Sequence, residues 1–197
     1  MATARMEEKR RRMLDAARVV MLRDGLRGAT MEAIAREAGI AKATLYAQFS
    51  DKDAVFGALV VSLRDTLLAA FEDGIDREGS AAVRIGSALA AHYLALSQIL
   101  EGSPHASELM SEHKRLGASL RDTDLAMQDR MTTALAQAGA TAPADLARLL
   151  SAASYGIALK TRDEETMAAH IRLMCRHVID GETIAAHPAH AEIIQGN

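Results

Sequence analysis

A short segment early in the chain, residues 42–48, collects side chains that can donate hydrogen bonds at close spacing. They are an ammonium, two hydroxyls and an amide around a small alanine, namely Lys42, Ala43, Thr44, Tyr46 and Gln48. Such groups suit the acceptors on base edges in the major groove of DNA and on the flanking phosphates. We therefore take this segment as a candidate contact surface for double-stranded DNA.

Two short predicted helices would position these side chains. The first is Thr30–Ala38, with Thr30 as N-cap, and the second is about Ala41–Gln48. Gly39 lies between them, where a reversal of the chain with positive φ would need glycine. A longer predicted helix, Glu7–Asp24, precedes them. Two short helices joined by a glycine-containing turn, after a longer helix, are the layout of a helix-turn-helix.

A long amphipathic helix is predicted next. Ser50 is its expected cap, and Asp53 three residues later would complete a capping box. The stretch 73–80 is rich in Gly and Asp and predicts a loop. Further long amphipathic segments follow, and the last one is expected to end at Gly181.

The composition favours an all-α fold. The chain has 197 residues, 49% hydrophobic and 3% aromatic, with three prolines and no tryptophan. Its apolar residues are mainly Ala, Leu, Ile, Val and Met, and the residues that strands prefer are few. A single cysteine, Cys175, excludes an internal disulfide and favours a cytoplasmic location. No apolar run reaches the roughly 20 residues of a membrane span, so we expect no membrane partner.

The charge is unevenly distributed along the chain. Up to residue 60 there are 11 basic and 8 acidic residues, a net charge of +3, whereas the whole chain carries −3 and the remainder therefore −6. A basic N-terminal region on an acidic body fits a protein that presents one end to phosphates, although runs of charge are often only solvated faces.

The stretch Gly25–Lys52 resembles the DNA-binding domain of the TetR family of transcriptional regulators. It matches in the glycine before the second helix, the threonine that opens it, the Ile-Ala pair and the Ala-Gly turn. The most specific part is the signature Leu45-Tyr46-x-x-Phe49-x-x-Lys52. With its flanking helices, the resemblance covers about Lys9 to Phe56.

The resemblance implies a contact for each candidate side chain. Lys42, Ala43 and Thr44 would reach bases or adjacent phosphates, and Gln48 would read a base edge or bind the backbone. An alternative for Lys42 is a solvated side chain that makes no contact with DNA. Ala43 departs from the family pattern, in which glycine is common at this position, and this leaves open which bases are read.

Three other residues would hold phosphates. The resemblance implies that Thr30 caps its helix and touches a phosphate, that the Tyr46 hydroxyl binds another, and that Lys52 clamps a third. The alternatives are a cap alone for Thr30 and solvated side chains for the other two. The run 10–12 of three arginines is either an arm on DNA or a solvated face. Ala41 replaces a frequent serine cap, at a cost of about 1 kcal/mol, and Met21 replaces a packing aromatic.

The resemblance also implies the domain organisation. Residues 1–56 would form the helix-turn-helix domain, with a connecting helix to about residue 74, residues 75–181 a helical regulatory domain, and residues 182–197 a loosely ordered tail. The last two long helices would pair two copies into a homodimer. Each has a row of apolar residues along one face, and small residues between them permit a second helix to approach closely. The seam would comprise Leu146, Leu149, Ala153, Ile157, Met167, Ile171, Met174 and Val178. The alternative is that these stripes form the core of a single chain.

A pocket for a small apolar or amphipathic effector is implied in the regulatory domain. Its candidate lining is His92, Tyr93, Leu96, Met110, Met127, Met131 and Tyr155. Methionine-rich helices are also ordinary core, which is the alternative. His105, Glu108 and Glu112 share a helical face but are expected on the solvated surface, so no metal and no cofactor is predicted.

These patterns favour a transcriptional repressor that an effector releases from a palindromic operator. An effector-independent regulator or an activator would share the same N-terminal motif. An all-α enzyme is the remote alternative, because no convergent nucleophile, base and acid, phosphate loop or metal motif is visible, and no catalytic residue is assigned.

Overall fold

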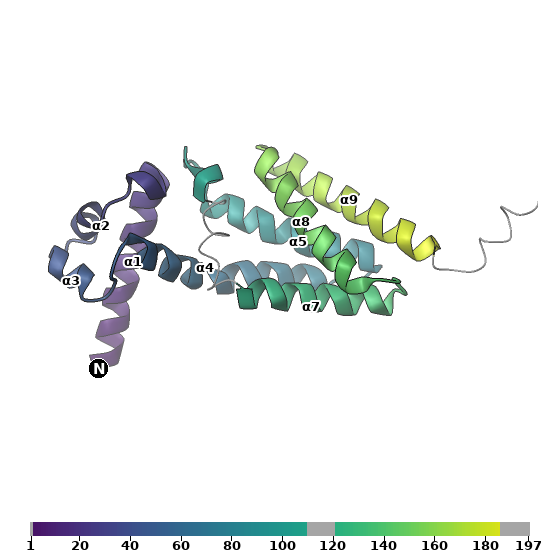
Figure 1. Ribbon diagram of the computed structural model, residues 1–197, viewed down its shortest axis with the longest axis horizontal. Helices are drawn as coiled ribbons and strands as arrows, with labels where there is room; N and C mark the ends of the chain where they lie inside the picture. The colour runs from purple at the N-terminus through teal and green to yellow at the C-terminus, as the bar shows by residue number, and fades with distance from the viewer. Residues whose placement is uncertain (1, 110–120, 186–197) are drawn as a thin grey trace, which may run out of the picture. The chain divides into compact units, whose positions relative to one another are not determined.

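Every regular element in the described part of the chain is a helix. The computed structural model describes residues 2–109 and 121–185, and the side chains of 5–109 and 124–182. The all-α prediction is thereby confirmed. The helices are α1 Ala2–Gly28, α2 Met31–Glu37, α3 Lys42–Tyr46, α4 Lys52–Ile75, α5 Ala81–Ile99, α7 Arg121–Gln137, α8 Pro143–Lys160 and α9 Glu164–Ala185 (Figure 1).

The described residues divide into two compact units. The first unit lies within Met1–Asp65 and Leu100–Arg121, and the second within Thr66–Ile99 and Asp122–Asn197. The helix α4 contributes to both. The second unit therefore takes in the end of α4, which the sequence assigned to a connecting helix.

The first unit is built on α1, which packs against α2, while α2 packs against α3. Met13, Ala17 and Val20 of α1 lie in this core and are fully buried. Ile34 of α2 and Leu45 of α3 are also 0% exposed. These buried anchors fix the two short helices, which are too short to be stable alone.

The end of α1 is broken at Gly25, where the backbone has φ 72° and ψ 170°. The segment 103–109 packs against this break. The positive φ favours glycine at this position, and a Cβ on Gly25 would also lie 2.6 Å from Glu108 Oε2 and 2.9 Å from the His105 ring. Ser103 Oγ donates to the Leu22 carbonyl at 2.6 Å, which satisfies an acceptor at the break.

Several predicted helix ends are corrected. The cap of α4 is Asp51 and not Ser50, because Asp51 Oδ1 accepts the Ala54 N–H at 2.7 Å while the Ser50 hydroxyl donates to Asp51. The predicted capping box with Asp53 is therefore wrong. The first helix begins before Glu7, α4 extends into the predicted 73–80 loop as far as Ile75, and α9 continues past Gly181. The rest of the predicted tail lies outside the described residues.

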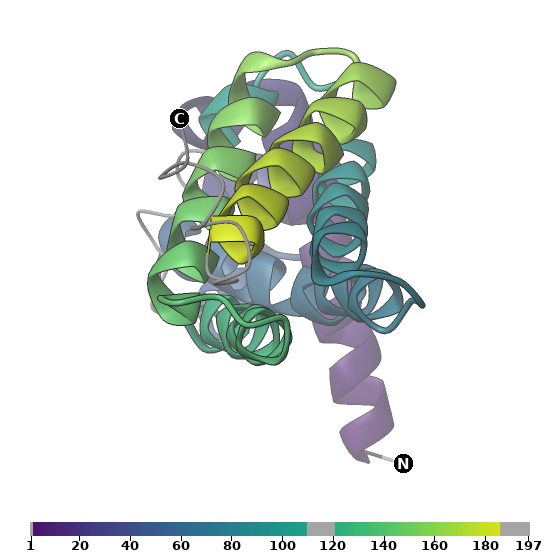
Figure 2. The same ribbon diagram turned by 90° about the vertical axis from the view of Figure 1, so that its right-hand side faces the viewer.

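The second unit relies on close helix approach. A Cβ on Gly86 of α5 would lie 3.3 Å from the Arg172 Cα and from the Cys175 Cβ of α9. A Cβ on Gly74 of α4 would lie 2.4 Å from the Ala88 Cα of α5. Burial raises the pKa of the Cys175 thiol to about 12, so this cysteine is a packing residue. Figure 2 shows α9 with α8 on one side and α5 on the other.

By length and apolar composition alone, α4 meets the requirements of a membrane span, and no other helix in the described ranges does. It carries Arg64 and Asp65 near its middle, and its Phe56 and Phe71 are buried. A core helix passes the same test of length and composition, so α4 carries no membrane assignment.

Candidate nucleic-acid interface

The turn between α2 and α3 is held by its own backbone. Thr30 Oγ1 accepts the Ala33 N–H at 3.1 Å, which confirms the predicted cap of α2. Gly39 adopts φ 64°, as the reversal requires. The Ile40 N–H donates to the Ala35 carbonyl at 3.0 Å across this glycine, a Schellman-type ending of α2. The direction of α3 is therefore set by local bonds.

The helix α3 presents the predicted contact face to solvent. Leu45 is fully buried and anchors the helix, whereas Tyr46 is 45% exposed. Lys42, Ala43 and Gln48 are also exposed, and Thr44 is half-buried. Ala41 makes no side-chain cap, as expected of alanine. The predicted donors thus lie together on the accessible side of one buried anchor.

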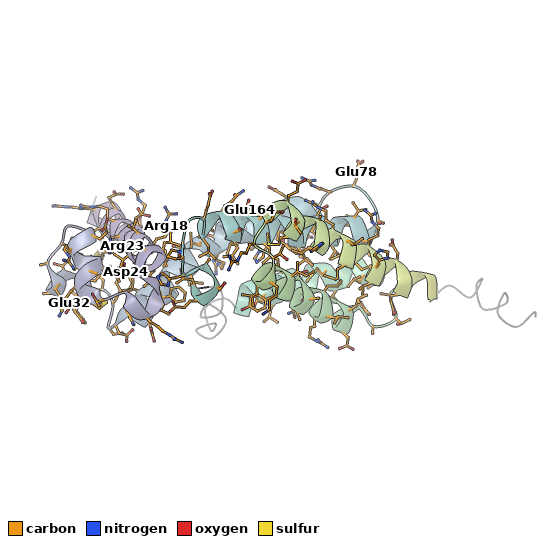
Figure 3. The ribbon with its side chains drawn as sticks, turned by 90° about the horizontal axis from the view of Figure 1, so that it is seen from above. Arg18, Arg23, Asp24, Glu32, Glu78 and Glu164 are labelled. Carbon is orange, nitrogen blue, oxygen red and sulfur yellow. The ribbon has the colours of Figure 1, made fainter. Side chains whose placement is uncertain are left out.

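Glu32 is a member of this face that the sequence did not single out. Its carboxylate, on α2, accepts a hydrogen bond from the Lys42 ammonium of α3. The ammonium also lies 5.5 Å from the centroid of the Tyr46 ring, within the range of a cation–π contact. The hydrogen bond lowers the pKa of the Glu32 carboxyl and raises the pKa of Lys42. Figure 3 shows Glu32 projecting from the first unit.

Lys52 has protein partners in addition to its predicted phosphate. Its ammonium donates to the carbonyls of Leu26 at 2.8 Å, Arg27 at 3.3 Å and Ala29 at 3.5 Å. A cation at the carbonyl end of a helix is favourable because those carbonyls lack intrahelical partners. This half-buried lysine therefore ties the start of α4 to the end of α1. This role could not be predicted from the sequence, because the acceptors are backbone atoms far away along the chain.

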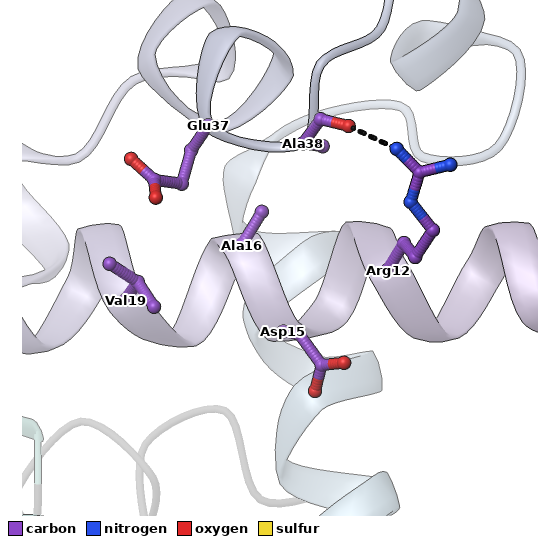
Figure 4. A pocket seen from close by; sticks show the side chains of 6 residues that line it. All are labelled: Arg12, Asp15, Ala16, Val19, Glu37 and Ala38. Atoms are coloured by element: carbon purple, nitrogen blue, oxygen red, sulfur yellow. Dashed lines mark hydrogen bonds between the residues drawn. The ribbon is translucent and has the colours of Figure 1, made fainter.

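The three arginines at 10–12 each contact the first unit itself. The Arg10 guanidinium lies 4.9 Å from the centroid of the Phe49 ring, and Arg11 pairs with Glu8 at 2.8 Å. Arg12 donates to the Ala38 carbonyl at 3.2 Å, a bond drawn in Figure 4. The guanidinium of Arg12 thus reaches the turn that carries α3.

Two shallow hollows lie between α1 and α2. One, of about 260 Å³, is lined by Arg12, Asp15, Ala16, Val19, Glu37 and Ala38 (Figure 4). The other, of about 450 Å³, is lined by Arg23, Ala33, Arg36 and Glu37. Arg23 pairs with the adjacent Asp24 at 2.8 Å and approaches Glu37 at 3.9 Å. Both hollows are lined by groups of both signs and have no preference for an anion.

The predicted pocket residues that the structure describes belong to the second unit. Tyr93, Met127 and Met131 are buried, His92, Leu96 and Tyr155 are half-buried, and Met110 lies outside the described residues. The rings of His92 and Tyr93 meet edge to face at 5.0 Å, and His92 Nδ1 lies 3.2 Å from the Leu67 carbonyl oxygen. Burial raises the pKa of Tyr93 far above its ordinary value, so its hydroxyl stays protonated.

The predicted dimer seam is only partly accessible. Leu146, Met167 and Ile171 are buried in the core of their own chain, at 9%, 3% and 0% exposure. Ala153, Ile157, Met174 and Val178 are half-buried. Leu149 remains 56% exposed, and Leu173 of α9, which is not among the predicted seam residues, is 50% exposed.

Among the described residues, no group of three metal-ligating side chains lies close enough to hold an ion. His105 and Glu108 approach each other at 3.5 Å, but they pack against the break in α1. Glu112, the third member of the helical face in the sequence, lies outside the described residues.

Comparisons with known proteins identify the helix-turn-helix region. Residues 13–59 match the family described as "Bacterial regulatory proteins, tetR family". The HTH-type transcriptional regulator SrpR of Pseudomonas putida is 37% identical over 82 residues, which cover 41% of this chain and 38% of SrpR. The chain thus spans less than half of the length of this relative.

Two solved structures share the whole fold. A transcriptional regulator from Rhodococcus sp. Rha1 has a TM-score of 0.70 at 23% identity, covering 88% of this chain and 97% of the other. SmeT, described as the repressor of the Stenotrophomonas maltophilia multidrug efflux pump SmeDEF, has a TM-score of 0.65 at 23% identity, covering 86% and 89%. The match of residues 13–59 and their signature residues assign the helix-turn-helix to the TetR family of bacterial regulatory proteins, and the two solved structures show that the chain shares their fold.

Proposed function

We propose that this protein is a DNA-binding transcriptional regulator that inserts α3 into the major groove of an operator. The observation that carries this proposal is the exposed face of α3, where Lys42, Tyr46 and Gln48 surround the buried anchor Leu45. Recognition helices of this kind bring their first residues to base edges. The basic charge of the first 60 residues would attract phosphates over a longer range.

The contacts divide by chemistry. Lys42 and Gln48 would contact base edges, with Ala43 and Thr44 as close neighbours. The exposed Tyr46 hydroxyl would bind a phosphate, and Thr30 would add a second phosphate contact while it caps α2. Lys52 would contribute a positive potential near the backbone while its ammonium holds the end of α1.

A homodimer would supply two reading helices. The accessible apolar and small residues of the last two helices are Leu149, Ala152 and Gly156 on α8 and Leu173 on α9. They follow i, i+3, i+7 spacing on α8, and the open space around Gly156 permits close approach of a second helix. A symmetric dimer would place two recognition helices about 34–36 Å apart and would match a palindromic operator.

Release by an effector is the second part of the proposal. The buried Ser154 hydroxyl of α8 has no partner among the described residues, and Tyr93 is a second buried hydroxyl of the same unit. A small apolar or amphipathic ligand with one polar group would suit such an interior. SmeT is described as a repressor of a pump, which favours repression here. An effector would shift the dimer only by its differential affinity for the two states.

The alternatives are an effector-independent regulator and an activator, which would bind DNA through the same surface. The enzyme alternative loses its support, because the matched family is one of regulatory proteins. A regulator of this kind would work in the bacterial cytoplasm.

Selection of DNA by the purified protein from a random pool tests the proposal. The expected product is a palindrome with two half-sites about one helical turn apart. Tyr46→Phe should weaken binding to all selected sequences by a similar factor, since a phosphate contact carries no base preference. Failure to enrich any sequence, or binding by a monomer at a single half-site, would contradict the proposal.

A further inference from the structure

The contact between Glu32 and Lys42 joins two helices at the proposed reading surface. Lys42 is the first residue of α3, and Glu32 reaches it from α2. Both side chains remain open to solvent, with exposed fractions of 52% for Lys42 and 56% for Glu32. An ion pair that only joins two helices could be buried between them, whereas this pair is accessible to a bound DNA duplex.

The orientation of the ammonium is restricted by a second partner. The Tyr46 ring centroid lies 5.5 Å from Lys42 Nζ, one turn further along α3. The ammonium is therefore held between a carboxylate and an aromatic face, and its remaining N–H donors stay available. Glu32 is ionised at neutral pH, because the hydrogen bond from Lys42 lowers its pKa, so it acts only as an acceptor.

A neutral ion pair is poorly suited to phosphate binding. The carboxylate cancels the charge that would attract the backbone, and it repels phosphates itself. A side-by-side donor and acceptor instead match one feature of the major groove. A G·C base pair presents two acceptors, guanine N7 and O6, next to one donor, the cytosine N4 amino group. Lysine suits the guanine atoms, and glutamate accepts from cytosine N4.

We propose that Glu32 and Lys42 together read one G·C base pair in each half-site, with Glu32 as the residue that recognises cytosine. This inference rests on the proposed function and adds a base identity to it. It explains why an acidic side chain lies on a surface that otherwise favours anionic partners. It also makes α2 a source of base contacts and not only a support for α3.

The test is selection of DNA from a random pool by the wild type and by single variants. Glu32→Ala and Lys42→Ala should relax the preference at the same base pair, each by about tenfold, and leave other positions unchanged. Glu32→Gln keeps the side-chain length and should admit A·T at that position, because glutamine pairs bidentately with adenine. Circular dichroism confirms that each variant is folded, and Glu32→Gln serves if the alanine variant is not.

Glu37→Ala is the matched control, since it removes an acidic residue from the same helix at a site paired with Arg23. It should leave the selected sequence unchanged. Equal weakening at every position by Glu32→Ala would show a structural staple and overturn the proposal. Tighter binding to all DNA with a steeper salt dependence would show simple repulsion and would also overturn it. If the wild type selects no sequence, the proposed function itself fails, which is a different result.

Discussion

Different kinds of interaction stabilise the interior of the first unit and the interior of the second unit. In the first unit, polar side chains bind backbone groups at helix ends, as Lys52 does for α1, Arg12 for α2 and Asp51 for α4. In the second unit, long helices approach closely at small residues, as Gly74 does against Ala88.

The short helices of the first unit, α2 and α3, contribute to this difference. Short helices such as α2 and α3 bury little apolar area and leave a large share of their backbone groups unsatisfied, so each polar tie counts. Long helices satisfy their own backbone and gain stability from packing. The first unit should therefore be sensitive to the loss of charge and the second to added volume.

The largest expected effect is a change of volume in α4. Gly74→Ala should lower the free energy of unfolding by about 2 kcal/mol or more, because the new Cβ would lie 2.4 Å from the Ala88 Cα and backbone must move. Gly57→Ala is the control in the same helix but in the first unit, where a Cβ meets nothing within 4 Å. It should stabilise by about 0.5–1 kcal/mol. Denaturant unfolding measures both, and equal effects would contradict the comparison.

The next effect concerns charge in the first unit. Lys52→Met should lower the free energy of unfolding by about 1–2 kcal/mol, because three carbonyls lose their donor. Lys42→Ala, which removes an exposed ammonium from α3, should leave stability nearly unchanged and weaken operator binding. Thermal unfolding measures the effect of each variant on stability, and a mobility-shift assay on the same samples measures its effect on operator binding. If Lys52→Met leaves the free energy of unfolding unchanged, Lys52 does not stabilise the fold, and its predicted role is phosphate binding alone.

The sequence predicted those parts of the fold that depend on local chemistry. The Thr30 cap and the Gly39 reversal follow from neighbours within a few residues, and the structure bears them out. The partners of Lys52 and Glu32 could not be predicted, because they depend on where distant backbone and side-chain atoms come to lie. At the start of α4, several polar residues compete for one cap, and spacing alone favoured Ser50 over Asp51.

The dimer seam shows a second limit of sequence reasoning. An apolar stripe at heptad-like spacing looks the same whether it packs within one chain or between two. Met167 and Ile171 turn out to face their own core, while Leu149 and Leu173 remain exposed. Burial in the folded chain, and not periodicity, separates these sets.

Ser154 is the exception in the second unit, a buried hydroxyl without a partner among the described residues. Ser154→Ala should raise the free energy of unfolding by about 1 kcal/mol, since an unsatisfied polar group is removed from an apolar interior. Ser151→Ala, at a half-buried position of α8, is the control and should change it little. Calorimetry measures both. Destabilisation by Ser154→Ala would mean that the hydroxyl has a partner in solution.

The smallest effect should appear in the pH dependence of the α4 cap. Hydrogen bonds from the Ala54 N–H and then the Ser50 hydroxyl lower the folded-state pKa of Asp51. A lowered pKa stabilises the fold above the unfolded-state value of about 3.9 and loses this contribution as the pH falls through the folded value. Asp51→Asn should therefore be less stable than the wild type at neutral pH, and the difference should vanish at an acidic pH below the folded-state pKa of Asp51.

The control for this measurement is Asp53→Asn, which removes a charge from the same first turn without touching the cap. Thermal unfolding of all three proteins at both pH values isolates the capping carboxylate, because every other acid is shared. Only the Asp51 variant should converge on the wild type with acidification. A difference in stability that persists at low pH would show that the effect of the substitution does not come from the charge of Asp51, and the capping carboxylate would then contribute less to the first unit than proposed.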